Sequence, residues 1–192
     1  MNAQRDDGYD HPPMPATQDY HPPYFGDPDG GDHLARPINW NTLTAGEAEQ
    51  EWLDLNRWVD WLRRTYGLPP AIVPPLWHRH DELVWELSAL HLHWLNSYDP
   101  DASPSAPLAW HRDFADARHR LREWVATCGT RLDRDRPTRL TAWPGETPIR
   151  PEPEALIANR DEDFVAFVLD DVRRRRPDPT SGDAEIPGLR SR

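Results

Sequence analysis

The chain has 192 residues, a net charge of −11 at pH 7 and a mean hydropathy of −0.87, with 22 prolines and ten tryptophans. Its acidic balance makes nonspecific nucleic-acid binding unfavourable, because acidic surfaces repel phosphate, and its single cysteine, Cys128, excludes an intrachain disulfide. The N-terminus lacks the apolar run of a secretory signal, and no stretch reaches the roughly 18 apolar residues of a membrane helix, so we expect no membrane contact and a cytoplasmic location.

Residues 1–39 are predicted to form a disordered arm, because they are rich in proline and aspartate and poor in aliphatic side chains. His11 and His21 are each followed by two prolines, a pattern that favours polyproline II. Such a repeat is either a docking motif or part of an ordinary proline-rich tail, and we favour the tail because short motifs match by chance.

Residues 40–130 are predicted to form a tryptophan-rich, antiparallel three-helix bundle. Thr44 and Glu47 fit a capping box at the start of the first helix, whose apolar stripe runs to Tyr66. The second helix is expected from about Pro75 to about Tyr98 and the third from about Pro107 to Cys128. The third has an apolar stripe of Trp110, Phe114, Ala117, Leu121, Trp124 and Cys128. Helices of similar length joined by short linkers favour antiparallel packing.

The remaining chain is predicted to add one helix to this bundle. Residues 131–158 read as an irregular linker, and residues 159–176 as an amphipathic helix that begins at Asn159 and ends in arginines. We expect this helix to dock on the bundle or on a partner, and residues 177–192 to be a disordered tail. The fold class is therefore all-α.

The segment 77–94, WHRHDELVWELSALHLHW, concentrates histidines and carboxylates. His80 and His91 fall within the apolar stripe of the second helix, so we interpret them as structural, hydrogen-bonded core imidazoles rather than as ligands or bases. The polar face carries the only candidates for a weak zinc site, although a solvated face is the favoured interpretation: His78, Glu82, Glu86 and His93. Histidines two residues apart lie on different sides of a helix and cannot hold one ion.

Catalytic templates are missing from the sequence. It contains no glycine-rich phosphate loop, no Gly-x-Ser-x-Gly and no Cys-x-x-Cys. Cys128 would lie at a helix C-terminus, where the negative end of the helix dipole opposes a thiolate nucleophile. We therefore predict no catalytic residues and no cofactor, and favour a protein that is not an enzyme.

Three large apolar side chains point away from the predicted stripes: Trp61 on the first helix, and Trp85 and Leu92 on the second. They are either buried internally, under the fourth helix for example, or exposed as an aromatic patch. Exposed patches of this kind typically mark partner surfaces, so these three residues are the candidate partner surface.

A spaced set of aromatic, proline and histidine residues runs through the predicted bundle: Trp52, Trp58, Val59, Tyr66, Pro74, Trp77, His80, Glu86, Leu87, Ala89, Leu90, Trp94, Trp110, Phe114, Arg120, Leu121, Trp124 and Cys128. This pattern resembles an uncharacterised family of small actinobacterial proteins, a domain of unknown function often encoded near plasmid or integrative-element transfer genes. The resemblance covers residues 40–130 and, more faintly, Phe164–Val172. It implies an accessory role beside a mobile genetic element and carries over no catalytic or binding residue.

The leading hypothesis for function is a non-enzymatic adaptor that binds an unknown protein partner. One alternative is a metal-binding protein or metal-dependent enzyme that uses His80 or His91 with Glu82 or Glu86. A second alternative is an acidic DNA mimic, which the arginines interspersed among the acids disfavour. The oligomeric state is left open.

Overall fold

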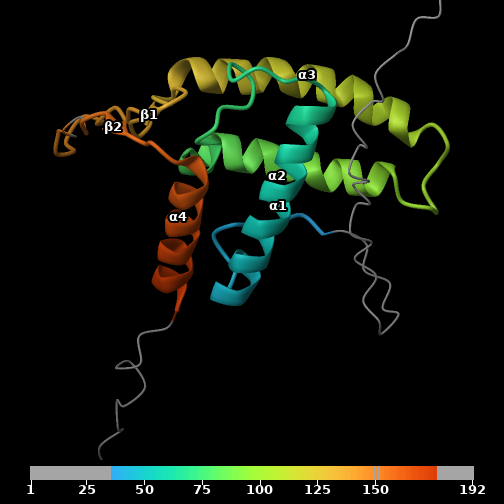
Figure 1. The fold of residues 1–192 in the computed structure, drawn as a ribbon, viewed down its shortest axis with the longest axis horizontal. Helices are drawn as coiled ribbons and strands as arrows, with labels where there is room; N and C mark the ends of the chain where they lie inside the picture. Colours follow the sequence, from blue (N-terminus) through green and yellow to red (C-terminus); the bar gives the residue numbers. More distant parts are fainter. Residues whose placement is uncertain (1–35, 149, 151, 177–192) are drawn as a thin grey trace, which may run out of the picture. The chain divides into compact units, whose positions relative to one another are not determined.

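The computed structural model describes residues 36–148, 150 and 152–176, all within the compact unit His33–Arg192 (Figure 1). The helices are α1 (Ala45–Thr65), α2 (Asp81–Ser97), α3 (Ala106–Thr127) and α4 (Arg160–Arg175), with a 3₁₀ turn at Trp77–Arg79. Strands β1 (Arg134–Asp135) and β2 (Ala155–Leu156) form an antiparallel pair. The predictions for residues 1–35, including the proline motifs at His11 and His21, and for residues 177–192 lie outside the described residues.

Helix ends form where the sequence places capping side chains. The backbone N–H of Thr44 donates to the Glu47 carboxylate at 2.8 Å, and the Glu47 N–H donates back to the Thr44 hydroxyl, so the predicted capping box is confirmed. Gly67 ends this region with a φ of 58°, which glycine adopts without strain. Asn159 accepts hydrogen bonds from the N–H groups of Asp161 and Glu162 and caps α4 as predicted.

The all-α fold with a fourth amphipathic helix is confirmed, but the four helices do not all run side by side as they would in a simple bundle. Helices α2 and α3 lie side by side and antiparallel, whereas α1 crosses them and pairs with α4 (Figure 1). Among the described helices, none is both long enough and apolar enough to span a membrane.

The core is aromatic and joins all four helices. Trp52 of α1 contacts Trp40 and Trp77, and it meets Phe164 and Phe167 of α4 edge to face. On α3, Trp110 stacks on Phe114 with ring centroids 4.8 Å apart. The burial of these large aromatic rings stabilises the helical fold.

Two local predictions are wrong. The second helix begins at Asp81 rather than near Pro75, because residues 77–79 form a tighter 3₁₀ turn and His80 is extended, with φ −125° and ψ 107°. Trp124 is 44% exposed although it was placed in the core stripe of the third helix, because it lies at the edge of that stripe. Within the stretch predicted as irregular, the β1–β2 pair adds a small element of order.

Candidate functional site

Three parts of the chain meet around the imidazole of His80. His80 is the N-cap residue of α2, and Cys128 is the C-cap residue of α3, so the antiparallel pairing brings these helix ends together. Asp135 belongs to strand β1, and Thr138 follows it. We call His80, Glu82, Cys128, Asp135 and Thr138 the His80 centre.

Short contacts connect these side chains. The Nε2 atom of His80 lies 2.8 Å from Oδ1 of Asp135, and its Nδ1 atom lies 3.1 Å from the hydroxyl oxygen of Thr138. The Thr138 hydroxyl donates to Oε1 of Glu82 over 2.6 Å. His80 and Asp135 are buried, and Glu82 is partly buried. The prediction that His80 is a hydrogen-bonded core imidazole is therefore confirmed, with partners contributed by a distant segment.

The same centre brings together three types of metal-binding atom. One ligand atom each from His80, Glu82 and Cys128 lies within 4.8 Å of the others, the one such group of three found among the described residues. The Cys128 thiol is buried, and it donates a weak hydrogen bond to the carbonyl of Val125 at 3.6 Å. Burial is the main cause that raises the pKa of this thiol, and the nearby Glu82 and Asp135 carboxylates act in the same direction.

His78 has a different neighbourhood from the one the sequence indicated. It was predicted to be solvated, but it is fully buried, because the 3₁₀ turn directs its ring towards α4. Its Nε2 atom lies 2.8 Å from Oδ2 of Asp163, which also accepts hydrogen bonds from Arg79. Burial lowers the pKa of His78 to about 4. Burial alone would raise the pKa of Asp163, but the hydrogen bonds from Arg79 and His78 lower it.

His91 is a core residue, as predicted. Its ring stacks on the indole of Trp58 with a centroid separation of 4.9 Å. Burial lowers its pKa to about 4, so the neutral ring is the species that fits this aromatic environment.

The four residues proposed for a zinc face on the second helix do not converge. His78 pairs with Asp163, Glu86 accepts hydrogen bonds from Arg120, and His93 lies 3.1 Å from Asp113. Glu82 alone belongs to a cluster with metal-binding atoms, and its partners there are His80 and Cys128.

The three residues predicted to form a partner surface differ in their exposure to solvent. Trp61 is partly buried and contacts Trp58, Tyr66 and Trp94, so it belongs to the edge of the core. Leu92 is partly buried, whereas Trp85 is exposed on α2. Trp85 therefore remains available to a partner.

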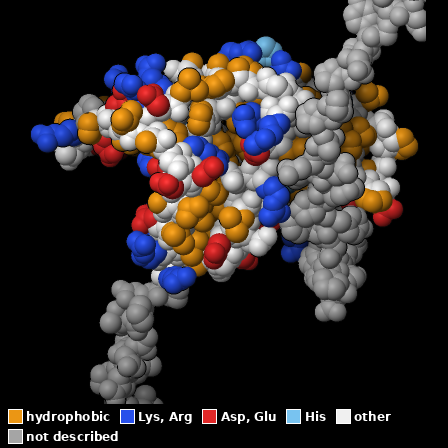
Figure 2. All heavy atoms as spheres, in the orientation of Figure 1, with side chains coloured by type: hydrophobic (Ala, Val, Ile, Leu, Met, Phe, Trp, Pro, Cys, Tyr) orange, Lys and Arg blue, Asp and Glu red, His pale blue; other side chains and the backbone are white. Residues whose placement is uncertain are grey.

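The most exposed large apolar side chains lie elsewhere. The described residues between α3 and α4, which we call the α3–α4 segment, extend away from the helices around β1 and β2 (Figure 1). Trp143 is 75% exposed and Leu140 is 71% exposed, and Leu132 and Leu156 are similarly exposed. Figure 2 shows hydrophobic side chains on this projecting part and also over α4, where Val165 and Leu169 are exposed.

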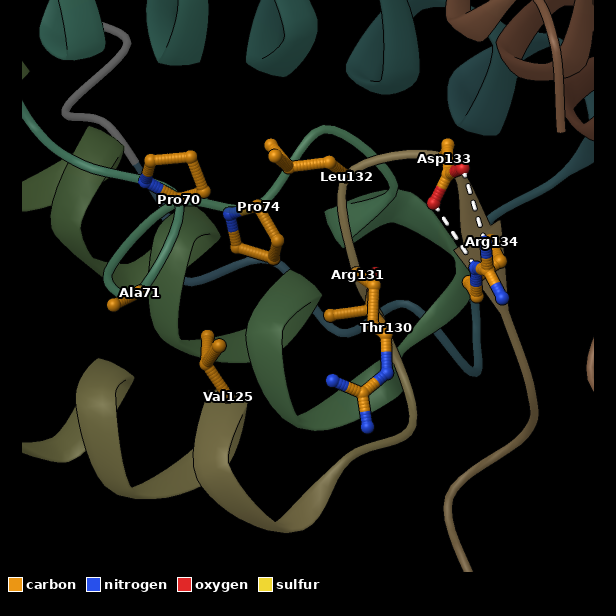
Figure 3. A pocket seen from close by; sticks show the side chains of 9 residues that line it. All are labelled: Pro70, Ala71, Pro74, Val125, Thr130, Arg131, Leu132, Asp133 and Arg134. Carbon is orange, nitrogen blue, oxygen red and sulfur yellow. Dashed lines mark hydrogen bonds and ion pairs between the residues drawn. The ribbon is translucent and has the colours of Figure 1, made fainter. Parts of the chain in front are cut away.

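A pocket of about 510 Å³ lies at the base of the α3–α4 segment (Figure 3). Pro70, Pro74 and Val125 form an apolar side, and the charged lining residues are Arg131 and the ion pair of Arg134 with Asp133. Among the described residues, no side chain of the His80 centre lines this pocket.

Comparisons with protein-family models, curated proteins and solved structures find no match to this chain.

Proposed function

We propose that this chain is a non-enzymatic adaptor, which binds another protein through the α3–α4 segment. The observation that carries the proposal is the exposure of Trp143 and Leu140 on a part of the chain that extends from the helices. Tryptophan is the residue most enriched at the energetic centres of protein interfaces, because its large ring buries much area at little entropic cost.

The anchoring of this segment also supports the proposal. The β1–β2 pair and the His80–Asp135 contact fix the base of the segment on the helical core. A recognition loop held in place at its base loses less conformational entropy on binding than a free one. The expected partner offers an apolar cleft that accepts the indole of Trp143, and Trp85 on α2 is a secondary contact. An accessory role beside a mobile genetic element, which the family resemblance implies, remains a prediction.

Site-specific photo-crosslinking in the organism that encodes the chain tests this proposal. A photoreactive amino acid at position 140 or 143 is expected to give a discrete adduct with one protein. Leu108 on α3 is the matched control, because it is 73% exposed but lies outside the segment. The Trp143→Ala substitution should abolish the adduct formed from position 140 and leave the circular dichroism unchanged. Equal adducts from positions 108 and 140, or none from either, would contradict the proposal.

A further inference from the structure

We infer that the His80 centre is a zinc-type metal site, with the His80 imidazole, the Glu82 carboxylate and the Cys128 thiolate as ligands. The inference goes beyond the adaptor function, since it concerns buried side chains that the exposed surface does not include. It begins with the convergence of one nitrogen, one oxygen and one sulfur atom within 4.8 Å of each other.

The hydrogen bonds of His80 indicate which ring nitrogen is available. A carboxylate can only accept, so the contact with Asp135 places a proton on Nε2. The Thr138 hydroxyl has a single proton, and its 2.6 Å contact with Glu82 directs that proton to the carboxylate. Thr138 therefore has no proton left for Nδ1 of His80, although its oxygen lies 3.1 Å away. Nδ1 then carries either a proton of its own or a lone pair for a cation.

Asp135 occupies the position of a supporting residue in zinc sites. Histidines that bind metals usually donate their second N–H to a carboxylate, which fixes the ring and makes the other nitrogen a stronger ligand. The His80–Asp135 contact has this geometry, and Asp135 is itself buried. Asp135 lies on β1, and β1 pairs with β2. The ring of His80 is therefore fixed by a segment outside α2.

The donor set and its charge indicate the type of ion. Thiolate and imidazole ligands favour zinc and similar transition ions over magnesium or calcium, which prefer oxygen. One thiolate and one carboxylate together neutralise a divalent cation, so the ion and its three ligands carry no net charge, and the Asp135 carboxylate keeps its charge beside the N–H of His80. Binding releases the Cys128 proton to solvent as the sulfur–metal bond forms.

The distances are compatible with modest closure around an ion. The Nδ1 atom of His80 lies 3.9 Å from Oε1 of Glu82. Bonds of about 2.0 Å to nitrogen and oxygen and about 2.3 Å to sulfur bring ligand atoms to within about 3.3–3.8 Å of one another. The three ligand atoms, which lie within 4.8 Å of one another, therefore need to move closer by at most about 1.5 Å, and the Thr138 hydroxyl or a water completes the four ligands of a tetrahedral ion.

Cobalt(II) is the probe that tests this site. The full chain is treated with a chelator and titrated with Co²⁺, and we expect a thiolate-to-cobalt charge-transfer band that saturates at one equivalent and is removed by Zn²⁺. Cys128 is the only cysteine in the chain, so any such band reports on this residue. Cobalt that binds without a thiolate band is held by other histidines, and this result overturns the inference, as does an absence of binding.

Variants test the thiolate and carboxylate ligands and the residue that positions His80. Cys128→Ser should abolish the band, and Glu82→Gln should weaken cobalt binding by roughly tenfold or more. Asp135→Asn should keep the band but weaken binding by about 10–100-fold, since this residue only positions His80. His119→Gln on the exposed face of α3 is the matched control and should bind as the wild type does. Equal affinities for all four variants would contradict the assignment.

A second measurement uses only the wild-type chain, so it tests the inference even if the variants fail to fold. Zn²⁺ should slow alkylation of Cys128 in the wild-type chain, as followed by intact-protein mass spectrometry. Mg²⁺ at the same concentration should not. An alkylation rate that is unaffected by zinc overturns the inference without any substitution.

Discussion

The indole nitrogen of Trp52 donates a hydrogen bond to Oδ2 of Asp171 over 3.0 Å, and this buried contact joins α1 to α4. The same carboxylate accepts a hydrogen bond from Arg175, which in turn donates to the carbonyl oxygens of Trp40 and Leu43. The fourth helix is therefore an integral part of the core, attached by both apolar and polar contacts.

Substitutions at Trp52 separate these two kinds of contact. Trp52→Ala should lower the free energy of unfolding by about 3–5 kcal/mol, because it removes a large buried ring. Trp52→Phe should cost less, about 1–3 kcal/mol, since it keeps an aromatic ring but leaves Asp171 without its indole donor. Urea unfolding measures both, with the exposed Trp143→Phe as control. An unchanged midpoint for Trp52→Ala would mean that α4 does not pack as described.

Acidification should destabilise the fold. Burial lowers the pKa of both His78 and His91 to about 4, against about 6.5 in the unfolded chain. Between these values the unfolded chain binds more protons, so the free energy of unfolding falls as the pH drops from about 7 to about 4. Each histidine should contribute up to about 3 kcal/mol of this loss. Urea unfolding at a series of pH values is the test, and a flat profile across this range would exclude neutral, buried histidines.

Glutamine substitutions should distinguish the histidines by burial. His91→Gln should destabilise the fold, because it removes the ring that stacks on Trp58. His78→Gln should also be destabilising, contrary to the expectation from the sequence, because the buried ring hydrogen-bonds Asp163. His93→Gln should stay within about 0.5 kcal/mol of the wild type, since His93 is partly exposed. Thermal unfolding monitored by circular dichroism compares the three, and similar shifts for all would contradict this order.

Gly129 should tolerate no side chain. A Cβ atom there would overlap with Cγ of Arg136 and would lie 2.5 Å from the Arg136 carbonyl oxygen, which is backbone and cannot easily withdraw. Gly129→Ala should therefore destabilise the fold by about 1–3 kcal/mol. Gly46→Ala on α1 is the matched control, because nothing lies within 4 Å of its Cβ position and alanine favours the helix. Measured stabilities that are equal for the two variants would show that the 128–136 stretch packs more loosely than described.

Local signals in the sequence predicted the helices well. The capping side chains of Thr44, Glu47 and Asn159 act within a few residues of themselves, so their effect can be read without knowledge of the fold. Periodicity also predicts that His91 is buried, because it lies on the apolar stripe of α2, whereas His80 is buried as the extended N-cap residue and not as part of the helix.

The His80 centre could not be assembled from such signals. Asp135 and Thr138 lie in a segment without periodicity, and nothing local indicates that strand pairing with Ala155 and Leu156 places them on His80. The sequence misplaces His78 for a related reason, because helical turns counted back through a 3₁₀ turn give its side chain the wrong direction. Tertiary contacts decide these positions.

The separation of Trp52 from Asp171 by 119 residues constrains the order in which the chain folds during synthesis. Helices α2 and α3 are neighbours in sequence, so they can pair as soon as both have left the ribosome. The face of α1 around Trp52 has to wait for α4, since Phe164 and Phe167 are among the ring partners of Trp52. Nascent chains that end before residue 160 therefore expose that face to solvent, and we expect them to be the species that chaperones bind and that aggregates.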